Sequence, residues 1–231
     1  MMFFDPLYLL MLAPAMLLSA WAAWMTQARF ARWSRVGNMQ GMSGESVARF
    51  ILDRNGLEGV PVVPVQGTLG DHYDPAHRVV RLSEAVFYER SVSAMAVAAH
   101  ETGHAIQHAR GYKALALRSL AVPLASFGSN FGVIIIIAGL MLSFAQLAWV
   151  GVFLFGGTVL FQLVTLPVEL DASRRAKGEL MRLALVEPNE QVGVSQVLTA
   201  AAMTYVGAAL SSVLTLLYYV LRVSGQGRRR A

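Results

Sequence analysis

The chain has 231 residues and a formal net charge of +5. Hydrophobic residues make up 55% of it and charged residues only 14%, whereas an ordinary soluble domain has about 25% charged residues. With a mean hydropathy of +0.50, this composition excludes a conventional soluble enzyme and indicates a membrane protein. Cysteine is absent, which excludes disulfides and thiolate metal ligands.

The first apolar segment begins at Pro6 and carries no charged residue through Trp24. Its length is close to the roughly 20 residues that span a bilayer, and Trp21 and Trp24 are of the type that anchors a helix at the interface. A cleaved signal peptide normally has a basic residue before its apolar core, and none precedes Arg29. We therefore predict a retained transmembrane helix over residues 6–25.

Residues 26–118 are more polar and predict a small α+β domain. Amphipathic spacing predicts a helix over Ser43–Asn55, and prolines with β-branched residues favour an extended segment over Val60–Val65. Asp71–Pro75 is typical of a turn, and Arg78–Leu82 alternates as a short strand does.

A further helix is predicted from Ser91 to Ala109, and it contains His-Glu-Thr-Gly-His at residues 100–104, the HExxH pattern. Residues four apart share one face of a helix, so His100 and His104 can direct two imidazole nitrogens at one zinc ion. Glu101 lies beside them and can act as general base on a water at the metal. A random HExxH is expected in roughly one such chain in a few hundred, so we interpret the motif as a metal site.

His108 extends the same spacing, but eight helical residues rise about 12 Å, which is too far for one ion to bind both His100 and His108. The metzincin pattern fails as well, because its glycine turn follows the second His, whereas Gly103 lies inside the motif. Zinc hydrolases usually have three protein ligands and one position open for water. Without cysteine, the third ligand must be another His or a carboxylate.

Two further spans are predicted over residues 119–168, because these fifty residues contain no charged side chain. A tight turn near Ser143–Gln146 would make them a hairpin. A short polar segment follows over residues 169–190, then a last predicted span over residues 197–221 and a basic tail over residues 222–231.

The third ligand must lie on the same side of the membrane as His100, which requires an even number of spans between the two residues. The predicted hairpin supplies two, so the acidic residues of the 169–190 segment qualify. Glu169 comes first, and its rival Asp171 faces away from it on a helix. We choose Glu169, although an acidic residue at the end of a span is otherwise often an interfacial charge.

Several motifs together resemble the YugP-type neutral zinc metallopeptidases of bacteria. The resemblance covers roughly residues 38–222 and is carried by these segments: GMSGESVARFILDRNGL, DHYDP, RLSEAVF, AAHETGHAIQH, LPVELDASRRA and TAAAMTYVGAALSSVLTLLYY. That family is similar in plan to the membrane-bound gluzincins of the HtpX and CAAX prenyl protease type. The expected fold is therefore a predominantly α-helical integral membrane protein with a small α+β zincin-like metallopeptidase domain.

The resemblance carries His100, Glu101 and His104 over without change and matches Glu169 to the Glu of the gluzincin second motif. The Asp four positions after that Glu is replaced by Ser173 here, while an Asp stands at position 171. By the same resemblance, the segment Asp71–Leu82 would be the edge strand beside which a peptide substrate pairs.

These inferences predict a zinc-dependent metalloendopeptidase with one Zn²⁺ per chain. Zinc would be held by His100, His104 and Glu169, and Glu101 would be the general base. We expect a membrane or membrane-proximal protein as substrate, added as a strand beside Val79–Leu82. Candidates for an oxyanion stabiliser are His72, Tyr73 and Arg174. The alternative is a non-catalytic zinc-binding membrane scaffold that binds a partner.

Basic residues place the predicted site on the cytoplasmic side of a bacterial inner membrane, with several spans. They follow the first span and the hairpin, as the positive-inside rule requires on the cytoplasmic side: Arg29, Arg32, Arg35, Arg174, Arg175, Lys177 and Arg182. Four spans would then place the basic tail outside, against the rule. The tail indicates contact with the lipid bilayer, and no nucleic-acid partner is expected. The sequence leaves the oligomeric state open.

Overall fold

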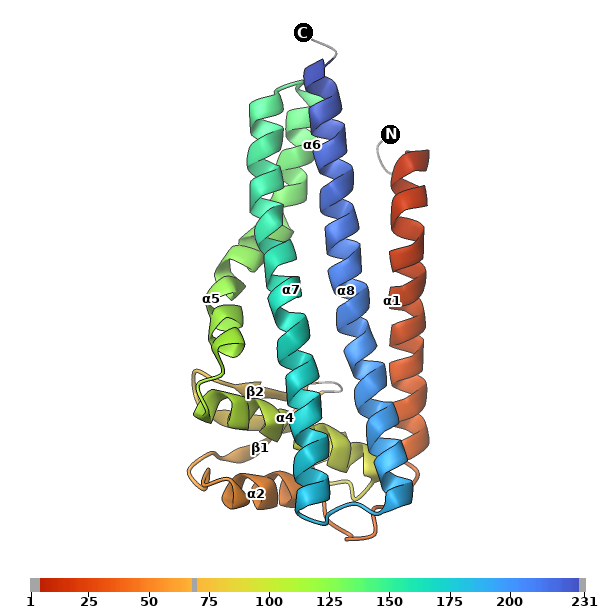
Figure 1. Ribbon diagram of the computed structural model, residues 1–231, viewed down its shortest axis with the longest axis vertical. Helices are drawn as coiled ribbons and strands as arrows, with labels where there is room; N and C mark the ends of the chain where they lie inside the picture. Colours follow the sequence, from red (N-terminus) through yellow and green to blue (C-terminus); the bar gives the residue numbers. More distant parts are fainter. Residues whose placement is uncertain (1–4, 68–69, 229–231) are drawn as a thin grey trace. The chain divides into compact units, whose positions relative to one another are not determined.

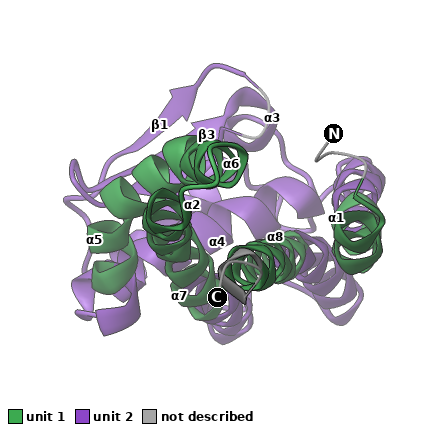
Figure 2. Ribbon diagram, turned by 90° about the horizontal axis from the view of Figure 1, so that it is seen from above, with its two compact units in different colours: residues 1–21, 116–167, 204–231 green, residues 22–115, 168–203 purple. Residues whose placement is uncertain are grey.

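The computed structural model describes residues 5–67 and 70–228, so the last three residues of the predicted basic tail lie outside it. The chain divides into two compact units (Figure 2). Unit 1 consists of residues 1–21, 116–167 and 204–231, and unit 2 of residues 22–115 and 168–203. Three long helices contribute to both units: α1 (Pro6–Trp33), α7 (Ala145–Arg182) and α8 (Pro188–Arg228).

Every secondary-structure element among the described residues of unit 1 is a helix. Besides its parts of the long helices, unit 1 contains α5 (Lys113–Phe127), the π-helical turn η2 (Gly128–Gly132) and α6 (Val133–Met141). The first three residues of α5 belong to unit 2. The chain reverses at Ser143, which has a positive φ of 55°, before α7 begins. Its buried cluster is apolar and aromatic, with Ile136 and Tyr218 among its most buried side chains.

Four helical stretches of the described chain are long and apolar enough to cross a membrane: Pro6–Trp33, Lys113–Met141, Ala145–Arg182 and Pro188–Gly225. Their apolar residues are largely on the surface, as lipid-facing side chains are. Together with the small sheet of unit 2, they confirm the predicted fold class, a predominantly helical membrane protein with a small α+β domain.

Unit 2 contains a three-stranded sheet beside several helices (Figure 1). The strands are β1 (Val62–Val65), β2 (His72–Asp74) and β3 (Val79–Ser83), in the order β1-β3-β2. β1 is parallel to β3, and β2 is antiparallel to β3. The chain passes from β1 to β3 through β2, without a helix. A single turn, α3 (Glu84–Phe87), follows the central strand.

Two helices pack together beneath this sheet: α2 (Gly44–Arg54) and α4 (Val92–Ala109). Each begins at a serine cap, because Ser43 Oγ accepts from the Ser46 amide and Ser91 Oγ from the Ala94 amide, both at 3.2 Å. The inner face of α4 consists of small and apolar residues, and its contacts with α2 and the later part of α7 form the main buried cluster of unit 2. This packing fixes the helix that carries the HExxH sequence.

Two local predictions were wrong. Asp71–Pro75 is not a turn: residues 72–74 form β2, and the turn is residues 75–78, ending at Arg78 with a φ of 52°. Backbone pairing with β3 outweighs the local turn preference of these residues. Val79–Leu82 also cannot accept a substrate strand, because β3 lies between β1 and β2 and both of its edges are paired. The edge strand is β2.

Candidate metal centre

The structure brings His100, His104 and Glu169 together, from helices α4 and α7. One carboxylate oxygen, Glu169 Oε2, lies 3.1 Å from His100 Nε2 and 3.4 Å from His104 Nε2. Two ligand atoms bound tetrahedrally at zinc distances of 2.0–2.2 Å are separated by about 3.3–3.5 Å, which these spacings approach. The three donor atoms all lie within 4.8 Å of one another. These residues therefore fit a zinc ion as three protein ligands.

Gly103, inside the motif, allows α4 to approach α7 closely. A Cβ at this position would lie 2.7 Å from the carbonyl oxygen of Ala172, which is shorter than any ordinary contact. Ala172 follows Glu169 by less than one turn of α7, so this close approach sets the spacing between the histidines and the carboxylate. Sequence reasoning used Gly103 only to reject the metzincin pattern and missed this packing role.

Glu101 is buried beside the cluster. The backbone N–H of Tyr73 on β2 faces its carboxyl group and acts to lower its pKa, as the smallest of several influences. Burial raises the pKa of Glu101 to about 7, and the neighbouring carboxylates of Glu169 and Asp71 act in the same direction while His100 opposes them. A carboxylate in this place can exchange a proton near neutral pH.

Gln107 fixes the orientation and the tautomer of His104. The Gln107 side chain is fully buried, and its Nε2 donates to the Val168 carbonyl oxygen at 2.8 Å and to Asp171 Oδ2 at 2.9 Å. The Asp171 oxygen also accepts from Arg175 Nε at 2.6 Å, so it is a carboxylate acceptor. Gln107 Oε1 therefore faces His104 Nδ1 at 3.0 Å, and this nitrogen must carry the proton. In the neutral ring His104 Nε2 is then unprotonated, as a metal ligand must be.

Ser173 contacts the Nδ1 atom of His100, as Gln107 contacts that of His104. It follows Glu169 by one helical turn, and its Oγ lies 3.2 Å from His100 Nδ1. Ser173 therefore makes a hydrogen-bonding contact with a histidine of the cluster. Asp171, the rival ligand, does not join the cluster but supports His104 through Gln107.

Sequence reasoning missed Gln107. Its only signal was a polar side chain three residues after the second His of the motif, on the helix face that His100 and His104 share. A buried amide needs hydrogen-bond partners, so this position could have been singled out as a support for His104.

The remaining candidates lie elsewhere. His108 Nδ1 is 2.8 Å from Tyr73 Oη, so this pair is directed away from the metal ligands. The exposed His72 contacts the Gly70 carbonyl oxygen at 2.7 Å, and the Arg174 side chain is 78% exposed beside Asp171. Within the described chain, none of the three proposed oxyanion stabilisers contacts the cluster.

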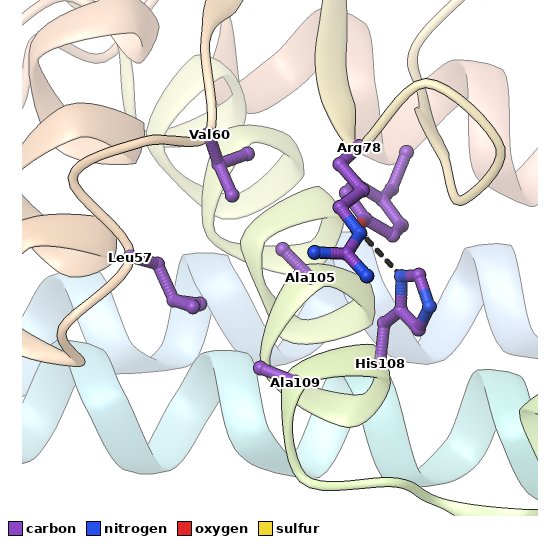
Figure 3. A pocket seen from close by; sticks show the side chains of 7 residues that line it. Leu57, Val60, Arg78, Ala105, His108 and Ala109 are labelled. Carbon is purple, nitrogen blue, oxygen red and sulfur yellow. Dashed lines mark hydrogen bonds between the residues drawn. The ribbon is translucent and has the colours of Figure 1, made fainter.

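A pocket with a volume of about 220 Å³ adjoins the other side of Tyr73 (Figure 3). The α2–β1 loop, Tyr73, the turn after β2 and the last turns of α4 form its walls. It is lined by Leu57, Val60, Tyr73, Arg78, Ala105, His108 and Ala109.

The long apolar helices and the three-residue cluster fit a membrane-associated protein with a zinc site, and the comparisons with known proteins agree. A family model described as "Putative neutral zinc metallopeptidase" matches residues 8–224, and the chain belongs to this family. It is 47% identical over 215 residues to the "Putative membrane protease YugP" of Bacillus subtilis (strain 168), covering 93% of this chain and 96% of that protein. No solved structure matches the chain significantly.

Proposed function

We propose that this chain is a zinc metalloendopeptidase embedded in the bacterial inner membrane, with one zinc ion held by His100, His104 and Glu169. The observation that carries the proposal is that Glu169 Oε2 lies close to the Nε2 atoms of both histidines, at 3.1 Å from His100 and 3.4 Å from His104. The hydrogen bonds of His104 support it, because they leave its Nε2 lone pair directed at the same point.

Zinc bound there supplies Lewis-acid chemistry, which polarises a carbonyl group and makes a water more acidic. Glu101 takes the proton of the attacking water and delivers it to the amine of the leaving fragment. The Tyr73 N–H faces the Glu101 carboxyl group and favours its ionised form, which accepts the proton. The Glu101 side chain is buried, so its carboxylate is shielded from bulk water.

The substrate binds as an extended strand along β2. Tyr73 of β2 lies opposite Val80 of β3. The Val80 N–H donates to the Pro61 carbonyl oxygen on the other side of β3, so Tyr73 and Val80 form a non-hydrogen-bonded pair of the antiparallel ladder. The Tyr73 backbone groups consequently point outward, with the N–H on Glu101 and the C=O available to a substrate N–H. Pairing through the backbone binds peptides with little preference for their side chains.

We further propose that the active site faces the cytoplasm and acts on membrane or membrane-proximal segments. Glu169 directly follows the uncharged residues 119–168, so the ligand lies at the end of a predicted span. The basic residues that follow the first predicted span and the predicted hairpin favour the cytoplasmic face.

The test is the Glu101→Gln variant, purified in detergent and assayed with casein, an unstructured protein. The variant should keep its zinc and lose turnover by about 10³-fold, because a general base contributes 10²–10⁴-fold. Glu84→Gln, an exposed carboxylate of α3, is the matched control and should retain full activity. Equal casein cleavage by Glu101→Gln and the wild type would refute the assignment. Zinc binding with no Glu101-dependent cleavage would favour the scaffold alternative.

A further inference from the structure

A buried hydroxyl group without a hydrogen-bond partner lies on helix α7. Thr165 is 2% exposed, and among the described residues its Oγ1 is the one buried side-chain nitrogen or oxygen that makes no hydrogen bond. A threonine inside a helix can donate to a carbonyl oxygen of the preceding turn, as Thr102 does to Ala99 at 2.7 Å. Thr165 does not. Burying a hydroxyl without a partner costs free energy, so its presence here needs an explanation.

Thr165 lies on the face of α7 that carries Glu169. Buried residues recur along this face at spacings of three or four: Thr165, Glu169, Ala172, Ala176 and Leu180. Exposed residues follow the same spacing on the opposite face: Leu163, Pro167, Leu170, Arg174 and Gly178. The proline between Thr165 and Glu169 therefore does not turn the two side chains to different faces.

The Glu169 carboxylate is within reach of the Thr165 hydroxyl. A side chain on a helix leans towards the N-terminal end, over the residue four positions earlier, and the two Cβ atoms are about 5–6 Å apart. Glu169 Oε2 faces the two histidines. A carboxylate has about four lone-pair sites on its two oxygens, so Glu169 can accept from Thr165 in addition to its other contacts.

Each histidine of the site has a polar partner on the nitrogen away from Glu169. Gln107 contacts His104 Nδ1 at 3.0 Å, and Ser173 contacts His100 Nδ1 at 3.2 Å. Metal-binding carboxylates generally have such hydrogen bonds as well, and these orient the ligand. Thr165 would give Glu169 the same kind of support.

We propose that Thr165 is a positioning residue for Glu169, and that its hydroxyl donates to the carboxylate oxygen that does not bind the metal. This inference rests on the proposed zinc peptidase function. The hydrogen bond holds Glu169 as a ligand through one oxygen, so that one position at the metal stays open for water.

The test compares Thr165→Val, which has nearly the same shape without the hydroxyl, with Thr165→Ser, which keeps it. Zinc affinity in detergent is measured by competition with a chelator, and stability by thermal unfolding of the zinc-free protein. Thr165→Val should bind zinc about tenfold more weakly. Its zinc-free form should unfold at the same or a higher temperature, because an unpaired buried hydroxyl has been removed. Thr165→Ser should bind zinc as the wild type does.

Co²⁺ in place of zinc gives a second readout, because its visible absorption weakens when the number of ligands rises from four to five. Thr165→Val should weaken this absorption, since a carboxylate without the hydroxyl can bind through both oxygens. Thr158→Val is the matched control on the same helix, because its hydroxyl donates to the Ala125 carbonyl oxygen at 3.1 Å. It should lower the unfolding temperature and leave zinc affinity and the Co²⁺ spectrum unchanged.

Thr165→Ala removes the same hydroxyl and replaces Thr165→Val if that variant does not fold. Wild-type zinc affinity and Co²⁺ absorption in the folded variant would overturn the inference and leave the peptidase function standing. A wild type that binds no zinc would overturn both. Weakened zinc binding by Thr165→Val, with no casein cleavage by the wild type, would refute the peptidase function alone.

Discussion

Unit 1 packs its helices through apolar and aromatic side chains, whereas unit 2 buries charged and polar groups between its helices. All the buried carboxyl and imidazole side chains of the described residues belong to unit 2: Glu101, His104, Glu169, Asp171 and Glu190. Burying such groups costs free energy unless they are hydrogen-bonded or paired. Here the hydrogen bonds converge on the histidines and Glu169, so the polar interior of unit 2 is organised around one point.

Close helix contact serves a different purpose in each unit. In unit 1, Gly139 lets α6 approach α7, and a Cβ there would lie 2.3 Å from the Ala148 nitrogen. Small residues commonly bring helices together in this way in membranes. In unit 2, Gly103 brings α4 against α7 beside the proposed ligands. The comparison predicts that disturbing unit 2 removes the metal, whereas disturbing unit 1 lowers stability and leaves metal affinity unchanged.

The largest effect is expected from Gly103→Ala. The added methyl must push α4 away from Ala172, which separates the histidines from Glu169 and costs about 1–3 kcal/mol as overpacking. Zinc content by elemental analysis should fall to background, with a lower unfolding temperature. Gly178→Ala on α7 is the control, since no atom lies within 4 Å of its added Cβ. It should keep its zinc, and retention of zinc by Gly103→Ala would show that the approach is not needed.

Gln107→Leu should weaken zinc binding about 10- to 100-fold, measured by competition with a chelator. The leucine fills a similar volume but no longer fixes the tautomer of His104. In the zinc-free protein, ¹⁵N chemical shifts of His104 should show the Nδ1–H tautomer in the wild type and a mixture in the variant. An unchanged tautomer and zinc affinity would reduce Gln107 to a packing residue.

Ser173→Ala should have a smaller effect, a few-fold loss of zinc affinity. Its neutral hydroxyl contacts His100 Nδ1 at 3.2 Å and has no further charged support, unlike the Gln107–Asp171–Arg175 chain. A chelator competition in parallel with Gln107→Leu ranks the two supports. A larger loss for Ser173→Ala would reverse the proposed order.

Gly139→Ala, in unit 1, should leave zinc affinity per folded molecule unchanged. It should lower the unfolding temperature, because the methyl cannot fit against Ala148. Zinc affinity is measured on the folded fraction after size-exclusion chromatography in detergent. A marked loss of affinity would mean that the metal centre depends on the packing of unit 1, and the proposed difference between the two units would be wrong.

The sequence predicted the features that depend on composition and on helical spacing. Uncharged stretches indicated helices that can cross a membrane, and the structure confirms the fold class. His100 and His104 share a helix face by spacing alone. The requirement for an even number of spans selected the acidic residues of the 169–190 segment, and Glu169, the first of them, is the one that the structure brings to the histidines. Each of these inferences needed only local periodicity or the order of segments along the chain.

The features that were missed depend on contacts between segments distant in sequence. The three-residue strand β2 forms only because β3 pairs with it, so its local turn preference was misleading. The place of β3 at the centre of the sheet depends on β1 joining its other edge. The role of Gln107 depends on Val168 and Asp171, about sixty residues later in the chain, which no local pattern reveals.

The central claim is that Glu169 completes a three-ligand zinc site with His100 and His104. The most direct measurement is the zinc content of the detergent-purified wild type, of Glu169→Gln and of Glu187→Gln, an exposed carboxylate just beyond α7. One zinc per chain in the wild type and in Glu187→Gln, with none in Glu169→Gln, is the predicted result. Wild-type protein without zinc after reconstitution, or full zinc in Glu169→Gln, would contradict it.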